Sequence, residues 1–162
     1  MPTAAPLGMR ILLSPLLLLL FLTGCGSDTT SPEEQIRKML MAGEEAVESR
    51  SISAVQAHLS DQYSDRSGNQ KRMLTRILGG YFIAHQSIHL LTQIGPIVLN
   101  GEDQAEVTIF VAVAGQPIHS ASEFISLRAD LLRFDLKLVY EASQWLIRSA
   151  HWRKADMSDF LE

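Results

Sequence analysis

The change in hydrophobic period near Ile88 constrains the fold of this chain more than any other feature. Before Ile88 apolar residues recur at helical spacing, whereas after it they alternate with polar residues at a period of two. One alternating set consists of Ala105, Val107, Ile109, Val111 and Val113, and a second consists of Leu132, Phe134, Leu136, Leu138 and Tyr140. Helices followed by about four antiparallel strands predict an α+β fold.

Turn signals divide the alternating region into strands. Asn100-Gly101 is a strong hairpin signal, and Ala142-Ser143 predicts a second short turn. Residues 115–126 form a predicted loop, and Pro96 marks a bend or bulge inside the first strand. The signals therefore predict a meander in which each strand pairs with the next one along the chain.

Three helices are predicted before the sheet. Ser31 can cap the first helix, Pro32 suits its first turn, and Glu34 completes a capping box. A shorter helix restarts near Ser51, and a third runs over residues 70–85. Together with the strands, they predict three N-terminal helices packed on a curved antiparallel sheet.

The Gly79-Gly80 pair is unusual inside the third predicted helix. Each glycine weakens a helix by about 1 kcal/mol relative to alanine, so another requirement should favour glycine there. Close packing of the helix against the sheet is one requirement that would explain the pair.

An apolar run over residues 11–23 precedes the predicted domain. It is shorter than the roughly 20 residues that cross a bilayer, and Arg10 stands directly before it. A charged residue, an apolar run and a small-residue site are the layout of a secretory signal. We therefore expect residues 1–24 to be a signal peptide.

The end of this run, Leu22, Thr23, Gly24 and Cys25, resembles the bacterial lipobox. The resemblance implies that a lipid is attached to Cys25 and that the mature chain begins there, with residues 25–32 as a short tether. Gly26 in place of an aspartate favours the outer membrane, facing the periplasm. Several acyl chains on one residue provide stable anchoring where a single short chain is marginal.

Length and charge limit what the mature chain can be. Removing 24 of the 162 residues leaves 138, which suits one domain over residues 33–155 and a tail over 156–162. Without Arg10 there are 13 basic and 18 acidic residues, a net charge of −5. This charge argues against a nucleic-acid partner, because such proteins concentrate basic residues on one surface. The single cysteine excludes an internal disulfide framework.

The order and lengths of these elements, from about Glu33 to Arg153, resemble the nuclear transport factor 2-like superfamily, a cystatin-like α+β cone. The hairpin IVLNGEDQAEVTIFVAV and the closing strand pair LRFDLKLVYEASQWLIRSAHW carry this resemblance. Ketosteroid isomerase, scytalone dehydratase, small polyketide cyclases and non-catalytic binding modules belong to that superfamily. The resemblance therefore implies a fold and leaves the chemistry open.

Asp65 lies roughly where the isomerase has its general-base aspartate, and Tyr63 stands nearby. A base at this place would need a pKa raised by burial. The surrounding segment, residues 61–69, is rich in Asp, Ser and Gly, which favours a helix cap or a solvated loop instead. The isomerase oxyanion hole has no counterpart, since the first helix lacks a tyrosine and the inward set of residues 105–113 lacks an acid.

Several aromatic and histidine side chains are candidates for lining a mostly apolar pocket, and the alternative is that they simply fill the core. These candidates are Tyr81, Phe82, His85, Tyr140, Trp145 and His151. His85 and His89 are four residues apart, but they fall where helix changes to strand, so we predict no metal site. No cofactor-binding motif appears, and no cofactor is predicted.

Three functions remain open at this point. The leading interpretation is a non-enzymatic, lipid-anchored periplasmic module that binds a small apolar ligand or an envelope protein. The second is a lyase or isomerase of the polyketide-cyclase type with Asp65 as base, assisted by Tyr63 or Tyr81. The third is a structural subunit that forms a homodimer through the open face of the sheet.

Overall fold

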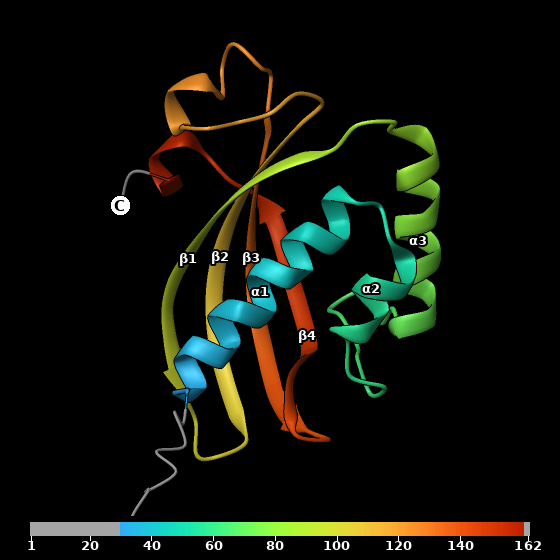
Figure 1. The fold of residues 1–162 in the computed structure, drawn as a ribbon, viewed down its shortest axis with the longest axis vertical. Helices are drawn as coiled ribbons and strands as arrows, with labels where there is room; N and C mark the ends of the chain where they lie inside the picture. The colour runs from blue at the N-terminus through green and yellow to red at the C-terminus, as the bar shows by residue number, and fades with distance from the viewer. Residues whose placement is uncertain (1–29, 161–162) are drawn as a thin grey trace, which may run out of the picture.

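A computed structural model describes residues 30–160 of the chain, and the predicted signal peptide, lipobox and Cys25 lie outside these residues. Figure 1 shows helices beside a twisted sheet. The helices are α1 (Pro32–Glu48), α2 (Ile52–Ala57) and α3 (Lys71–Ala84), and the strands are β1 (His89–Leu99), β2 (Gln104–Ala114), β3 (Asp130–Glu141) and β4 (Gln144–Lys154). The α+β class and the number of helices and strands are therefore confirmed.

The sheet is an antiparallel meander in the order β1-β2-β3-β4. At the first hairpin the Asn100 amide donates to the Gln104 carbonyl at 2.8 Å, and Gly101 takes a φ of +85°. Ala142 and Ser143 both have positive φ, as a two-residue type I′ turn requires. The register of β1 and β2 shifts between Ile94 and Ile97, which confirms the predicted bulge around Pro96.

Helix α1 begins as its sequence indicates and crosses the sheet diagonally in Figure 1. The Ser31 hydroxyl accepts a hydrogen bond from the Glu34 amide at 3.2 Å, which confirms the N-cap. The Glu34 carboxylate itself pairs with Lys38 Nζ at 3.0 Å. Pro32 occupies the first turn, where a missing amide hydrogen costs nothing.

We call the side of the sheet that α1 covers the inner face. Ile36 and Leu40 of α1 pack there against alternate residues of the strands. The buried residues of this cluster are Ile36, Leu40, Ala105, Val107, Leu136, Leu138 and Trp145. The alternating sets predicted from the sequence therefore do face the core.

We call the opposite side the outer face, and its upper part has a second, smaller core. Loop residues 115–129 and a short 3₁₀ helix, Met157–Phe160, cover the ends of the strands there. Phe160 lies edge-on to Phe124, with ring centroids 4.9 Å apart. Residues 157–160 of the segment set apart as a tail therefore contribute to the packing.

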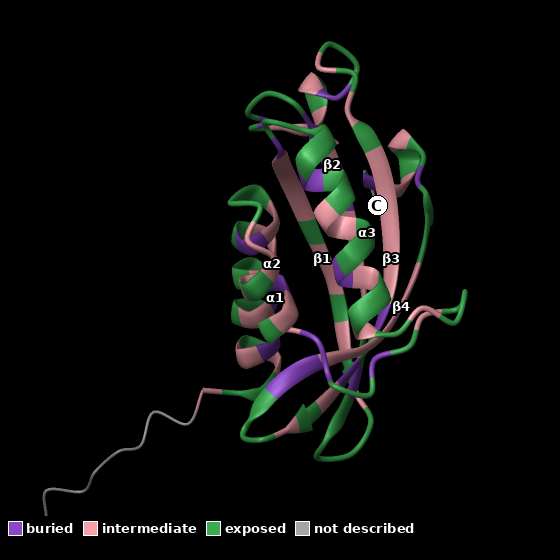
Figure 2. Ribbon diagram, turned by 90° about the vertical axis from the view of Figure 1, so that its right-hand side faces the viewer, coloured by how far each residue is buried: buried purple, intermediate pink, exposed green. Residues whose placement is uncertain are grey.

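Helix α3 stands beside α2 and away from the strands (Figure 1). It contacts α2 most closely, and several of its apolar side chains are exposed along the side seen in Figure 2. A Cβ at Gly79 would meet only Ile52 Cδ1, at 3.9 Å, and a Cβ at Gly80 would meet nothing within 4 Å. Close packing of this pair against the sheet is not observed, because no strand atom lies within 4 Å of a Cβ added at either glycine.

Candidate functional site

A hollow of about 570 Å³ lies on the outer face, below the second core. Strand register places its floor on the side opposite α1, because Thr108, Asp135 and His151 pair across β2, β3 and β4. The polar and exposed residues around it are Ser64, Asp65, Arg66, Val98, Glu106, Thr108, Asp135, Lys137, Ser149 and His151. Its volume falls within the range of about 300–1,000 Å³ typical of small-molecule sites.

One wall of the hollow comes from the segment after α2, which runs along the free edge of β4. The Ser60 amide donates to the Ile147 carbonyl at 3.0 Å, and the Ile147 amide donates to His58 at 2.9 Å. The Ser64 amide continues the pairing with Arg148 at 3.2 Å. This pairing covers the edge of β4 and brings Asp65 and Arg66 to the rim.

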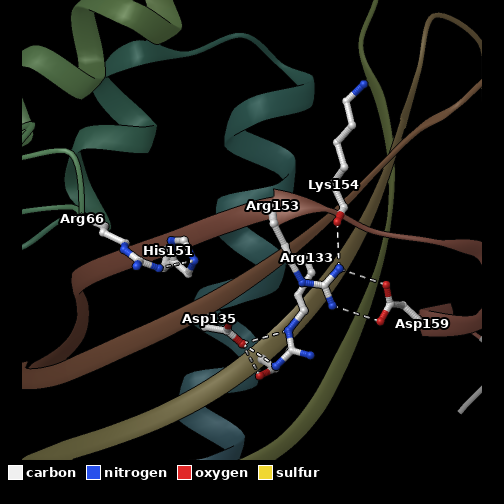
Figure 3. A network of polar contacts seen from close by, with 8 residues as sticks. Arg66, Arg133, Asp135, His151, Arg153, Lys154 and Asp159 are labelled. Carbon is white, nitrogen blue, oxygen red and sulfur yellow. Dashed lines mark hydrogen bonds and ion pairs between the residues drawn. The ribbon is translucent and has the colours of Figure 1, made fainter.

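Asp135 accepts three hydrogen bonds at the hollow (Figure 3). Its Oδ1 accepts from Thr108 Oγ1 at 2.8 Å and from Arg133 Nε and Nη2 at 3.0 and 2.9 Å. Partial burial alone would raise the pKa of Asp135, but the bonds from Arg133 and Thr108 outweigh it and lower the pKa. Asp135 is therefore ionised at neutral pH and poorly suited to act as a base.

Asp65 has a similar character. Its Oδ1 accepts from the amides of Ser67 and Asn69, both at 2.8 Å, and its Oδ2 accepts from Asn69 Nδ2 at 2.8 Å. Its slight burial would raise the pKa of Asp65, but these hydrogen bonds prevail and lower it. The carboxylate holds the 65–69 turn, a geometry that does not favour the general base anticipated from the sequence.

Arg66 and His151 form the remaining contact across the hollow (Figure 3). Arg66 Nη1 lies 3.3 Å from His151 Nε2. A guanidinium can only donate, so a hydrogen bond in this contact requires Nε2 to be the acceptor. Nearby, Lys137 Nζ pairs with Glu106 Oε1 at 3.5 Å.

Tyr63, the other catalytic candidate, is a buried residue of the same segment. Burial, and then the charge of Asp65, raise the pKa of Tyr63 to about 12. Its hydroxyl therefore stays protonated at neutral pH, as a packed structural tyrosine does.

The six pocket candidates are spread over three parts of the fold. Tyr81 and His85 stack at the end of α3, with ring centroids 4.0 Å apart, whereas Phe82 is buried beneath them in a cluster with α1 and α2. Tyr140 and Trp145 meet at the β3–β4 hairpin, 5.4 Å apart, with Trp145 in the inner core. Only His151 joins Asp65 at the hollow, because helix and strand periodicity turns the others elsewhere.

Sequence reasoning missed Glu44 and Arg66. Glu44 of α1 faces Thr92, whose position in the strand register is on the inner face. Burial raises the pKa of Glu44, hydrogen bonds from Thr92 partly oppose this, and the charge of Glu48 adds to it. Glu44 lies four residues after Leu40, so its place on the apolar stripe was the available signal.

Two findings concern other kinds of site within residues 30–160. No group of three or more His, Cys, Asp or Glu side chains is placed there to hold a metal ion. Nor is any helix of that part of the chain both long and apolar enough to cross a bilayer.

Comparison with known proteins places the fold. No family model matches the chain, and no curated protein does. Among solved structures, a scytalone dehydratase-like protein from Novosphingobium aromaticivorans matches with a TM-score of 0.64 and 13% identity, covering 76% of this chain and 84% of its own. A domain of unknown function with a cystatin-like fold from Nostoc punctiforme matches at 0.60 and 17%, covering 82% and 85%.

A third match is Bd1075 from Bdellovibrio bacteriovorus, with a TM-score of 0.59, 10% identity and 76% of this chain covered. The chain spans only 40% of the length of that protein. At such identities the likeness shows the fold alone, and the fold is the nuclear transport factor 2-like, cystatin-like one.

Proposed function

We propose that this chain is a non-catalytic binding module of the bacterial cell envelope. In this proposal a lipid on Cys25 holds it at the periplasmic side of the outer membrane, and an envelope protein docks on the outer-face hollow. The observation that carries the proposal is the state of Asp65 and Asp135, two of the three acids at the hollow. The pKa values of Asp65 and Asp135 are lowered and both accept several hydrogen bonds, so neither is prepared to take up a proton at neutral pH.

The lining of the hollow favours a protein partner over a small apolar ligand. Charged groups of both signs surround it, with Glu106 and Lys137 on the floor and Arg66 at the rim. An apolar ligand would leave these groups without water or a partner, which is costly for charges. A protein surface can supply matching polar groups and retain bridging water.

The anchoring part of the proposal follows from the sequence between Cys25 and α1, which begins at Pro32. A tether this short reaches about 25 Å when fully extended, so the domain would stay near the membrane surface. Replacing Cys25 by Ser should release the protein from membranes into the soluble fraction. Equal membrane partition of the variant and the parent would remove lipidation from the proposal.

Site-specific photo-crosslinking in cells tests the docking surface. A photoreactive amino acid at Val98, which lines the hollow and is 55% exposed, should give a discrete adduct with one envelope protein. The matched control is Met41, on α1 and 63% exposed, which should not give that adduct. The same adduct from both positions, or none from Val98, would contradict docking at the hollow.

Native mass spectrometry of the purified protein separates the alternative occupants. A mass excess that disappears on denaturation would replace the protein partner by a small ligand. A doubled mass would favour the homodimer, with the outer face as the interface between two copies.

Glu44 supports a second candidate function, a lyase or isomerase. It is an acid on the inner side of the sheet whose pKa is raised by burial, as a general base requires. Carbon-detected NMR titration of the Glu44 carboxyl, compared with the Glu44→Gln variant for assignment, would decide this. Titration above about pH 6 would support an enzyme, and titration below about pH 5 would remove this candidate.

A further inference from the structure

We infer that helix α1 is an intramolecular cap on the free edge of β1, where Glu44 and Glu48 occupy backbone amides that a second copy of this chain would otherwise pair with. The inference is independent of the docking function proposed for the outer-face hollow. It comes from the hydrogen bonds at the two edges of the sheet, which are protected in different ways.

The two edges of the sheet differ in what covers them. Segment 58–64 pairs with part of the β4 edge. On the opposite edge, no strand within residues 30–160 pairs with the far side of β1. The unpaired backbone groups of an edge strand are a template for another strand, and most proteins protect them with charged side chains, prolines or bulges.

Strand β1 provides little of this protection in its first half. Residues 89–99 contain no Asp, Glu, Lys or Arg. A bulge between Ile94 and Ile97, together with the missing amide hydrogen of Pro96, interrupts only the second half of the strand. Residues 89–94 are therefore a regular, uncharged edge, and their protection has to come from another part of the fold.

Helix α1 covers the amides of this first half. Glu48 Oε1 accepts a hydrogen bond from the Leu90 amide at 2.7 Å, so this amide is directed to the free edge and not to β2. Because alternate residues of an antiparallel strand direct their backbone groups to the same side, the Thr92 amide is the next one on this edge. The Glu44 carboxylate accepts from that amide and from the Thr92 hydroxyl. Carboxylates thus take the place of the carbonyl oxygens of a partner strand.

The spacing of the two acids matches the spacing of the two amides. Residues four apart in an α-helix are separated by about 6 Å along its axis, and residues two apart in a strand by about 7 Å. Glu44 reaches Thr92 and Glu48 reaches Leu90, so α1 and β1 run in opposite directions here. One helix turn therefore covers two successive edge amides.

The local sequence of α1 does not favour acids at these positions. Glu48 is the last residue of the helix, where the partial negative charge of the helix dipole disfavours a carboxylate, and no basic residue occupies the last turn. Like charges four residues apart also destabilise a helix. Burial raises the pKa of Glu44, and the charge of Glu48 adds to this, while Thr92 partly opposes it. Locally unfavourable acids indicate a requirement from the tertiary structure, and capping the β1 edge meets it.

A second copy of this chain is the partner that an uncapped β1 would accept. Two identical strands can pair antiparallel about a twofold axis, which places the same residues opposite each other on both sides. In residues 89–94 of β1 this pairing brings no like charges together, because these residues carry no acid and no lysine or arginine.

The experiment compares two double variants of the full-length protein in detergent. Glu44→Ala with Glu48→Ala removes both acceptors, whereas Glu44→Gln with Glu48→Gln removes the same charges and keeps an acceptor oxygen at each position. By native mass spectrometry, the alanine variant should dimerise at least about tenfold more tightly than the parent, and the glutamine variant should not. Amide exchange at Leu90 and Thr92 should be about tenfold faster in the monomeric alanine variant alone.

Gln93→Lys, added to the alanine variant, locates the contact between copies. Gln93 is an exposed residue of β1, between the two capped amides. Because like charges on paired strands repel, this addition should return the dimer to monomer.

Four outcomes would overturn the inference. If the alanine variant stays monomeric while its Leu90 and Thr92 amides exchange faster, an open edge does not recruit a second copy. If these amides exchange equally in the parent and the alanine variant, α1 does not cap the edge. Equal dimerisation of the alanine and glutamine variants would assign the effect to charge. A dimer that survives Gln93→Lys would place the contact on another surface.

Discussion

The inner and outer faces of the sheet are made by alternate residues of the same strands, yet they differ in almost every property. Leu136 and Leu138 of β3 point into the core beneath α1, while Asp135 and Lys137, one peptide away, line the polar hollow. Burying a leucine side chain contributes about 1.5–3 kcal/mol, and an exposed ion pair contributes about 0–1 kcal/mol. The inner face can therefore provide most of the stability, and our proposal assigns recognition to the outer-face hollow.

The largest expected effect on stability distinguishes the two faces through a pair of substitutions at adjacent residues of β3. Leu136→Ala should lower the free energy of unfolding by about 2–5 kcal/mol, because it opens a cavity in the inner core. Lys137→Ala should change it by less than about 0.5 kcal/mol, since this side chain is exposed. Urea denaturation followed by circular dichroism measures both. Similar losses from the two variants would show that the faces share the stability.

A smaller loss of stability is expected from a substitution in the second core, on the upper part of the outer face. Phe160→Ala removes a ring that packs on Phe124 and Phe110. We expect a loss of about 2 kcal/mol, less than a central Phe→Ala change, because a short terminal element can relax. Thermal unfolding gives the loss, and amide exchange should rise first at residues 118–124 of the covering loop. An unchanged melting temperature would mean that the outer face needs no core of its own.

The two glycines of helix α3 lie away from both faces of the sheet, and this determines whether alanine there stabilises the protein. Gly80→Ala should raise the free energy of unfolding by about 1 kcal/mol, because alanine favours the helix and nothing lies within 4 Å of the new Cβ. Gly79→Ala should stabilise as well, since it adds only an ordinary contact with Ile52. Destabilisation by Gly80→Ala, measured by chemical denaturation, would indicate that α3 packs against the sheet after all.

The smallest expected effects concern the pH dependence of stability. One acid on each face should change the free energy of unfolding with pH, and the two changes should have opposite signs. The pKa of Asp135 is lowered in the fold, so its stabilisation is fully present above its ordinary pKa of about 3.9 and is lost as pH falls through the lowered value. The pKa of Glu44 is raised, so its contribution is fully present below about pH 4.3 and is lost as pH rises through the raised value.

Replacing each acid by its amide tests these signs. Asp135→Asn should cost about 0.5 kcal/mol at pH 7 and nothing below its lowered pKa, since the side chain is 43% exposed and its ion pair is screened by solvent. Glu44→Gln should be neutral or slightly stabilising at pH 7 and without effect at pH 3. The free energies of unfolding of the parent and of each variant, measured from pH 2 to 8, give both effects. If the two substitutions change this free energy with the same sign at pH 7, the contrast between the faces is contradicted.

Much of the fold could be read from the residues themselves. The cap at Ser31, the hairpin at Asn100-Gly101 and the alternation of β2 and β3 depend on neighbours in the chain, and each formed as expected. The expectation for Gly79-Gly80 failed for a physical reason. The sequence shows that glycine weakens a helix there, but it does not show which part of the fold lies beside the pair.

The candidate site was much less accessible to such reasoning. Asp65 and His151 were both singled out, but they are 86 positions apart in the chain and meet only because the segment after α2 pairs with the edge of β4. Arg66 gave no signal at all, since one exposed arginine in a polar loop resembles any other.

The sequence by itself determined the succession of helices and strands and the two faces of each strand, because periodicity and turn chemistry act between near neighbours. Only the tertiary structure decided that Glu44 is half-buried beside Thr92 and that Asp135 is bonded by Arg133 and Thr108. It also decided that Arg66 lies against the His151 imidazole. The chemistry of a charged group depends on its burial and its partners, and both are set by contacts between distant parts of the chain.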